Sequence, residues 1–198
     1  MQKATVNTPA LGTLGDLFLG LPIEKLEDRV GWPIAALNSQ HLLKLHASSE
    51  HPIPSYVRSD NLERHWLRPD DILITLRNRP LRAAVIPNGF EQKHIAGPNL
   101  AVLRPREPLE PIYLVGLLRS EYGARLTEPL FSQSSMTPLI KLSELKQLII
   151  PMPSLETQHQ LAALMLAAER AEHADLERIQ TRRQIIGATL YQTLGSPS

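Results

Sequence analysis

The 198-residue sequence contains no cysteine. This absence excludes disulfide bonds, thiolate metal sites and a thiol nucleophile. Long apolar runs are also lacking, since the longest candidates, such as residues 114–118, fall far short of the roughly 18 residues that a membrane span needs. Residues 1–9 carry a single cation, Lys3, and do not show the basic and then apolar pattern of a secretory signal. These absences predict a cytoplasmic protein.

The chain also lacks a large net charge, since its formal net charge is only +1. The cations are nevertheless concentrated. Residues 77–106 contain six lysines and arginines and one acidic residue, Glu91, so this segment alone carries a charge of +5. A local basic segment in a nearly neutral chain indicates a surface that faces a polyanion. The alternative is that these arginines are only the solvated ends of strands.

Proline is missing from the stretch between Pro153 and residue 197, although the chain contains 17 prolines. Because proline interrupts helices, residues 1–153 should contain strands, turns and short helices. Residues 112–120 predict one of these helices, ended by Gly123. Apolar segments predict a hairpin and a further strand, at residues 71–76, 81–86 and 100–103. We therefore predict an α+β domain over residues 1–153.

The remaining residues, 154–198, predict one long helix. Alanine, leucine, glutamate, glutamine and arginine dominate it, and Ser154 is placed to act as its N-cap. About forty residues at ~1.5 Å each give a length of about 60 Å, more than the domain can cover. Its apolar residues recur at spacings of three and four and predict pairing with the helix of a second copy. They are Leu161, Met165, Ala168, Leu176, Ile179, Ile186, Leu190 and Leu194. Glu172 and Arg183 interrupt this stripe, and the alternative is a helix packed only on its own domain.

Four segments occur in an order that resembles type I restriction-modification specificity subunits. Residues 67–86 (LRPDDILITLRNRPLRAAVI) are similar to the family's turn and strand, basic loop and small-residue strand. Residues 99–105 (NLAVLRP) and 111–120 (PIYLVGLLRS) resemble the strand and the helix that follow. Residues 140–158 (IKLSELKQLIIPMPSLETQ) match most clearly, through an Ile-Pro-x-Pro turn that opens a long helix. Asp70 departs from the family's usual glycine, and the chain has one domain and one helix where a complete subunit has two of each.

The resemblance implies a non-catalytic target-recognition domain that reads one half of a bipartite site in double-stranded DNA. It implies that the long helix is a spacer and a docking site for a DNA adenine methyltransferase subunit, which brings S-adenosylmethionine, and for a restriction or translocase subunit. It implies no cofactor for this chain itself. Half-length chains of this kind can pair their helices in antiparallel fashion, so a homodimer with a palindromic, interrupted site is expected.

DNA recognition requires cations that bind phosphates and planar donors that bind base edges. The hairpin loop Arg77-Asn78-Arg79-Pro80 offers both kinds, and Arg82 follows it. The alternative is a solvated turn in which Asn78 and Pro80 only set backbone angles. Further candidates are Gln92, Lys93, His94 and Asn99, then Tyr56 and Arg58, and finally the polar loop 132–137.

Two functions of other classes remain as alternatives. Asp70 and the sequence Glu91-Gln92-Lys93 have the order of a PD-(D/E)xK nuclease motif, in which carboxylates hold Mg²⁺. Glu91, however, follows Asn88-Gly89, a turn signal, rather than lying on a strand. The other alternative is a helix-pairing adaptor whose domain contacts only protein. Salt-dependent binding to DNA would distinguish it from a DNA reader.

His41, His46 and His51 recur at intervals of five residues. That spacing places them on different sides of a helix, and no pattern of carboxylates accompanies them. The sequence therefore does not favour a metal site at these histidines.

Overall fold

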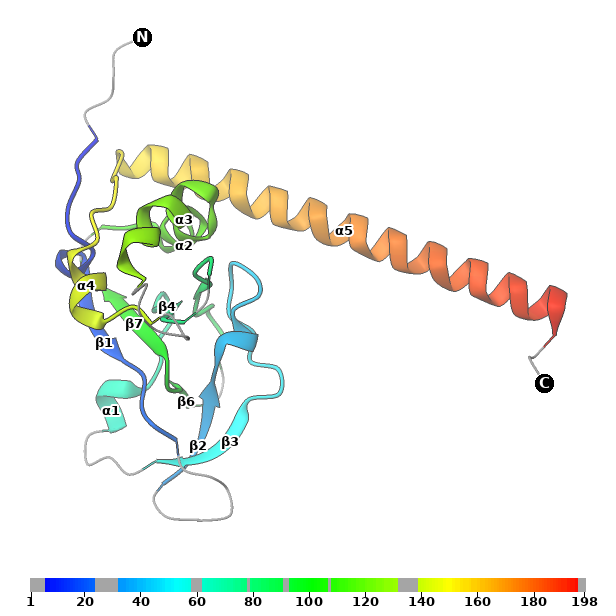
Figure 1. The fold of residues 1–198 in the computed structure, drawn as a ribbon, viewed down its shortest axis with the longest axis horizontal. Helices are drawn as coiled ribbons and strands as arrows, with labels where there is room; N and C mark the ends of the chain where they lie inside the picture. Colours follow the sequence, from blue (N-terminus) through cyan, green and yellow to red (C-terminus); the bar gives the residue numbers. More distant parts are fainter. Residues whose placement is uncertain are drawn as a thin grey trace, which may run out of the picture.

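Two sheets, several short helices and one very long helix make up the structure, a computed structural model (Figure 1). It describes residues 6–23, 32–57, 62–77, 79–90, 93–106, 108–131 and 139–195. The first sheet has the order β1 (Gly15–Leu19), β7 (Leu100–Pro105), β4 (Ile72–Thr75), β5 (Ala83–Val85), and its neighbours are antiparallel. The second has the order β3 (Ile53–Val57), β2 (Trp32–Leu37), β6 (His94–Ala96), with β2 antiparallel to β3 and parallel to β6.

Five α-helices and three short 3₁₀ turns accompany the sheets in the part of the chain that the structure describes. The helices are α1 (Leu62–His65), α2 (Pro111–Arg119), α3 (Glu121–Thr127), α4 (Leu142–Gln147) and α5 (Leu155–Leu194). The turns are η1 (Leu11–Thr13), η2 (Ser39–His41) and η3 (Glu128–Leu130). The α+β class and the long C-terminal helix predicted from the sequence are confirmed. None of the helices in these described ranges is both long enough and apolar enough to cross a bilayer.

Strand β4 lies inside the first sheet, and all four of its side chains are buried. Successive side chains of a strand point to opposite faces of its sheet. Ile72 and Ile74 accordingly pack in the same cluster as Leu114 of α2, whereas Leu73 packs with Leu37 of the second sheet. The first sheet therefore forms the middle layer, with helices on one face and the second sheet on the other.

The predicted hairpin and the strand that follows it are confirmed. Ile72 pairs with Val85 across the β4–β5 hairpin, and the same residue pairs with Leu103 of β7 on its other side. The predicted role of Gly123 is wrong: Ser120 ends α2 and caps α3, and Gly123 lies inside α3. A Cβ atom at Gly123 would lie 2.1 Å from the Leu117 carbonyl oxygen, so the glycine permits close packing of these two helices.

A buried ion pair links Asp71, directly before β4, to Arg104 of β7. Asp71 is 1% exposed, and its carboxylate accepts hydrogen bonds from the Nε and NH2 groups of Arg104 at 2.8 Å each. The same carboxylate accepts the backbone N–H of Arg68 at 2.8 Å. The Arg104 guanidinium also donates to the carbonyl of Trp66 at 2.8 Å. Both charges therefore have complete sets of partners, as buried charges require.

Helix α5 begins at Leu155, where the Ser154 side chain accepts the backbone N–H of Thr157, as the sequence predicted. Its first part packs on α2, and the rest extends away from the domain (Figure 1). The close approach to α2 occurs at Gly116, where an added Cβ atom would lie 2.0 Å from the Met165 sulfur. Leu161 and Met165, predicted as residues of the stripe for a partner helix, are half-buried against their own domain. The domain therefore covers the first part of the surface that the prediction gave to a partner helix.

Candidate nucleic-acid interface

Three connections that are distant in sequence meet at one end of the first sheet. They are the loop 38–51 after β2, the loop 76–82 between β4 and β5, and the turn 97–99 before β7. We call their described residues the loop face. Arg77 Nε donates to Asn99 Oδ1 at 2.7 Å, and an Arg82 NH group donates to the Ser39 carbonyl at 3.4 Å. These hydrogen bonds join all three connections into one surface.

The turn 97–99 depends on the left-handed backbone of Asn99, whose φ is 65°. Asparagine tolerates this conformation better than most residues. The Asn99 carbonyl accepts the backbone N–H of Leu76 at 2.9 Å, so the turn and the basic loop are also joined through the main chain. A main-chain hydrogen bond therefore supports the side-chain hydrogen bond between Arg77 and Asn99.

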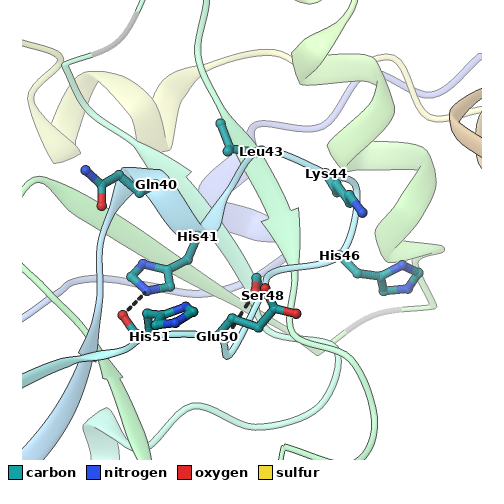
Figure 2. A pocket seen from close by; sticks show the side chains of 8 residues that line it. All are labelled: Gln40, His41, Leu43, Lys44, His46, Ser48, Glu50 and His51. Atoms are coloured by element: carbon teal, nitrogen blue, oxygen red, sulfur yellow. Dashed lines mark hydrogen bonds between the residues drawn. The ribbon is translucent and has the colours of Figure 1, made fainter. Parts of the chain in front are cut away.

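Two hollows open on the loop face. One, of about 290 Å³, is lined by residues that include Asn38, Ser39, Arg77 and Asn99. The other, of about 370 Å³, lies beside it along the loop 38–51 (Figure 2). Its lining consists of Gln40, His41, Leu43, Lys44, His46, Ser48, Glu50 and His51. In Figure 2 the Lys44 and His46 side chains lie together, away from His41 and His51.

His41, one of the three histidines that line the second hollow, is hydrogen-bonded within the protein. The backbone N–H of Asn38 donates to His41 Nδ1 at 3.0 Å, which leaves His41 Nε2 to donate to the His51 carbonyl at 3.3 Å (Figure 2). Among the described residues there is no group of three histidine, aspartate or glutamate side chains able to hold a metal ion. His41 is therefore part of the loop's internal structure.

Each arginine of the hairpin loop has a different environment. Arg77 is exposed and bonded to Asn99. The Arg79 guanidinium lies 3.1 Å from the Glu128 carboxylate and 4.4 Å from the centre of the Phe131 ring, yet it remains 40% exposed. The Arg82 side chain is half-buried and bonds to the Ser39 carbonyl, so it holds the loop 38–51 in place. Arg77 and Arg79 are thus the two arginines of this loop that another molecule can reach.

Other predicted residues lie elsewhere. His94 is 2% exposed and packs edge-on against Phe90, with ring centres 4.9 Å apart, so its prediction as a surface contact to DNA is wrong. Lys93 is exposed, and its ammonium lies 5.5 Å from the centre of the Trp66 ring. The half-buried Tyr56 lies on β3 of the second sheet, and Lys93 directly precedes β6, away from the end that Asn99 occupies. Arg58, Asn78, Gln92 and the loop 132–137 lie outside the described residues.

Arg119, a residue that no pattern in the sequence indicated, organises the loop 38–51 from beneath. Its guanidinium donates to the carbonyls of Leu42 at 3.2 Å, Leu43 at 2.7 Å, Lys44 at 3.0 Å and Ala83 at 3.2 Å. Burial lowers the pKa of Arg119, while the nearby Glu169 carboxylate acts in the opposite direction. An arginine stays charged even so, because a guanidinium loses its proton only far above neutral pH.

The same loop is bonded to the long helix. A carboxylate oxygen of Glu169, on α5, accepts the backbone N–H of Leu45 at 2.6 Å. Lys44 and His46, which flank that N–H, are both exposed on the loop face, and the sequence did not indicate either of them as a surface contact. In the sequence, only their alternation with the apolar Leu45 indicates that these two side chains are exposed, and this alternating segment is too short to interpret alone.

Comparison with known proteins gives a consistent result. No family model matches the chain. The chain is 26% identical over 149 residues to the putative type I restriction enzyme MjaX specificity subunit of Methanocaldococcus jannaschii, a match that covers 74% of this chain and 35% of that protein.

Solved structures have the same fold. A structure from a study of complex assembly and conformational transition in a type I R-M system aligns with a TM-score of 0.63 at 23% identity, over 95% of this chain and 44% of the other. The HsdS subunit of Thermoanaerobacter tengcongensis aligns with a TM-score of 0.55 at 24% identity, over 88% and 40%. The type I S subunit of M. genitalium aligns with a TM-score of 0.59 at 20% identity, over 98% and 47%.

The chain thus spans less than half the length of each of these relatives. The resemblance predicted from its segments between residues 67 and 158 is confirmed: in sequence and in fold, this chain is similar to one part of a type I restriction-modification specificity subunit.

Proposed function

We propose that this chain recognises a specific sequence in double-stranded DNA through its loop face and catalyses no reaction itself. The observation that carries the proposal is the convergence of Arg77, Asn99 and Lys44 from three separate connections onto one exposed surface. Similarity to proteins named as specificity subunits supports the same function. Cations and amides on loops held by a sheet are the groups that DNA recognition uses.

The Arg77–Asn99 pair is the first candidate for contact with bases. Arginine binds guanine through two hydrogen bonds and asparagine binds adenine in the same manner. The bond between the two side chains, at 2.7 Å, fixes their orientation before DNA arrives, which lowers the entropy lost on binding. Lys44 and Arg79 supply charges for phosphates on either side.

The nuclease alternative gains no support from the geometry. Asp70 lies in a turn with a φ of 68°, and its neighbour Asp71 is bonded to Arg104. Lys93, the lysine of the motif, lies over the Trp66 ring, and Glu91 is outside the described residues.

The partners belong to the same proposal. The exposed part of α5 supports pairing with a second copy, which would place two loop faces on one DNA molecule. A methyltransferase subunit that carries S-adenosylmethionine, and a restriction or translocase subunit, would dock on the assembled helices. The similarity to a type I system solved as a complex supports these partners.

DNA binding can be tested by selection from a pool of random double-stranded oligonucleotides. We expect enrichment of particular sequences, and binding that weakens steeply between about 50 and 200 mM salt. Arg77→Ala should weaken binding to the selected site about tenfold or more and relax its sequence preference at one position. Arg79→Ala should weaken binding more uniformly, without lowering the melting temperature.

Arg125→Ala is the matched control, because Arg125 is an exposed arginine on α3 that pairs only with Glu121 among the contacts described. It should bind DNA like the parent chain. If no sequence is enriched, or if Arg77→Ala binds like the control, the loop face is not the reading surface.

A further inference from the structure

The loop 38–51 runs alongside β5 and is held there by main-chain hydrogen bonds. The N–H of Val85 donates to the Leu45 carbonyl at 2.8 Å, and the N–H two residues beyond Leu45 donates to the Val85 carbonyl at 2.8 Å. His46 thereby forms a parallel β-bridge with Val85. Because successive side chains of an extended segment alternate, Leu45 is buried in the core while Lys44 and His46 are exposed.

The backbone N–H of Leu45 has its acceptor on α5. It donates to a carboxylate oxygen of Glu169 at 2.6 Å, across 124 positions of the sequence. Glu169 is half-buried, and a hydrogen bond to a charged acceptor is stronger than one between neutral groups. The Glu169 side chain therefore fixes the backbone midway between the two exposed side chains Lys44 and His46.

A second carboxylate of α5, that of Glu172, shares only part of this environment. Burial lowers the pKa of Arg119, and the carboxylates of Glu169 and Glu172 both act in the opposite direction, so both lie near its guanidinium. Among the hydrogen bonds between described residues, however, the one from α5 to the backbone of this loop is made by Glu169. The two carboxylates thus have a similar electrostatic role and differ in the bond to Leu45.

We propose that Glu169 is a positioning residue for DNA recognition: by holding the backbone of Leu45, it sets Lys44 and His46 against the phosphates of the bound DNA. The proposal rests on the proposed function and names a group outside the loop face that determines its geometry. Lys44 supplies a cation and His46 a ring N–H, and Figure 2 shows the two side chains together.

The direction of the effect distinguishes positioning from simple electrostatics. Glu169 carries a negative charge behind a surface proposed to bind a polyanion, so its charge alone opposes binding. If only this charge mattered, its removal would strengthen DNA binding. If Glu169 positions the loop, its removal weakens DNA binding although the net charge of the chain becomes more favourable.

The test uses full-length chains and the double-stranded oligonucleotide obtained by the selection described above. Fluorescence anisotropy gives the dissociation constant at several salt concentrations. Glu169→Ala should raise it about three- to tenfold, the effect of one lost contact. The slope of log K against log salt should also fall by about one, as it does in Lys44→Ala, because one phosphate contact is lost. Since Glu169→Ala removes no cation, a lower slope reports the displacement of Lys44.

Two variants provide the controls. Glu169→Gln removes the charge but retains an oxygen that can accept the Leu45 N–H, so it should bind within about twofold of the parent chain. Glu172→Ala removes a carboxylate that also lies near Arg119 but leaves the bond to Leu45, so it should bind DNA at least as tightly as the parent. Without DNA, amide exchange at Leu45 should be faster in Glu169→Ala than in either control.

A double-mutant cycle shows whether Glu169 acts through the two exposed side chains. In a chain that carries Lys44→Ala and His46→Ala, the further change Glu169→Ala should cause no additional loss of affinity. Combined with Arg77→Ala, which removes a different proposed contact, the losses should add.

The outcomes separate the positioning role from the function on which it rests. Unchanged or tighter binding by Glu169→Ala, or an equal loss in Glu172→Ala, overturns the role of Glu169. DNA recognition by the loop face still stands in that case if Lys44→Ala and Arg77→Ala weaken binding. A parent chain that enriches no DNA sequence overturns both proposals.

Discussion

Arg119→Ala is expected to lower the free energy of unfolding by about 3 kcal/mol, because hydrogen bonds to a charged group contribute roughly 1.5–3 kcal/mol each and only some of the lost ones are replaced by water. The guanidinium donates to four backbone carbonyls, three of them in the loop 42–44 and the fourth at Ala83 of β5. Removing the side chain leaves these acceptors beneath the loop face without their donor. Denaturant unfolding measures the loss.

Arg125→Ala is the control here too, since the exposed Arg125–Glu121 pair should contribute no more than about 0.5 kcal/mol. Amide hydrogen exchange adds a local measurement: the N–H of Leu45, bonded to Glu169, should lose protection in Arg119→Ala and keep it in the control. A loss of stability indistinguishable from the control would show that the four hydrogen bonds do not support the loop.

Asp71→Ala should be at least as destabilising, with an expected loss of about 3–5 kcal/mol. The substitution leaves the Arg104 guanidinium, which is only 17% exposed, without its counter-charge. It also removes the acceptor of the Arg68 backbone N–H at the entry to β4. Since β4 lies between β5 and β7, the damage should extend to the whole first sheet and lower the midpoint of a single unfolding transition.

Asp16→Ala provides the comparison, because Asp16 of β1 forms an ion pair at the surface with Arg106, which directly follows β7. Its removal should change the unfolding free energy by less than about 1 kcal/mol. Similar losses for Asp71→Ala and Asp16→Ala would contradict the assignment of Asp71 to a buried structural role.

The parts of the fold that were predictable are those with strong local patterns. The β4–β5 hairpin and β7 are continuous apolar runs between turn residues, and α5 is a long stretch of helix-forming residues with a serine N-cap. The second sheet was not predictable. Its strand β6 has only three residues, and it is a strand because Ile95 and its neighbours pair in parallel with β2, more than fifty residues earlier.

That missed strand explains the error at His94. The turn residues on both sides of it, Gly89 and Gly97, indicated a loop, and a histidine on a loop is expected to be exposed. Pairing with Ala35 instead places His94 inside, against Phe90. Tertiary pairing determined the burial of this side chain, and one sequence does not contain that information in any local pattern.

The candidate interface was predictable only in its hairpin loop. Arg77 and Arg79 belong to a basic turn that the sequence shows directly. The partner of Arg77, Asn99, lies next to it only because β4 and β7 are neighbours in the sheet. Lys44 lies on the same surface because its loop is hydrogen-bonded to Arg119 and Glu169, which come from two different helices. Each such contact depends on long-range packing.

The hydrogen bond from Leu45 to Glu169 has a mechanical consequence. One end of this bond belongs to the surface proposed to read DNA, and the other to the helix that would join two copies. Any bend of α5 relative to the domain must therefore strain the backbone between Lys44 and His46. Thermodynamic linkage makes such coupling reciprocal: if assembly shifts the affinity of the loop for DNA, then DNA shifts the strength of assembly by the same factor.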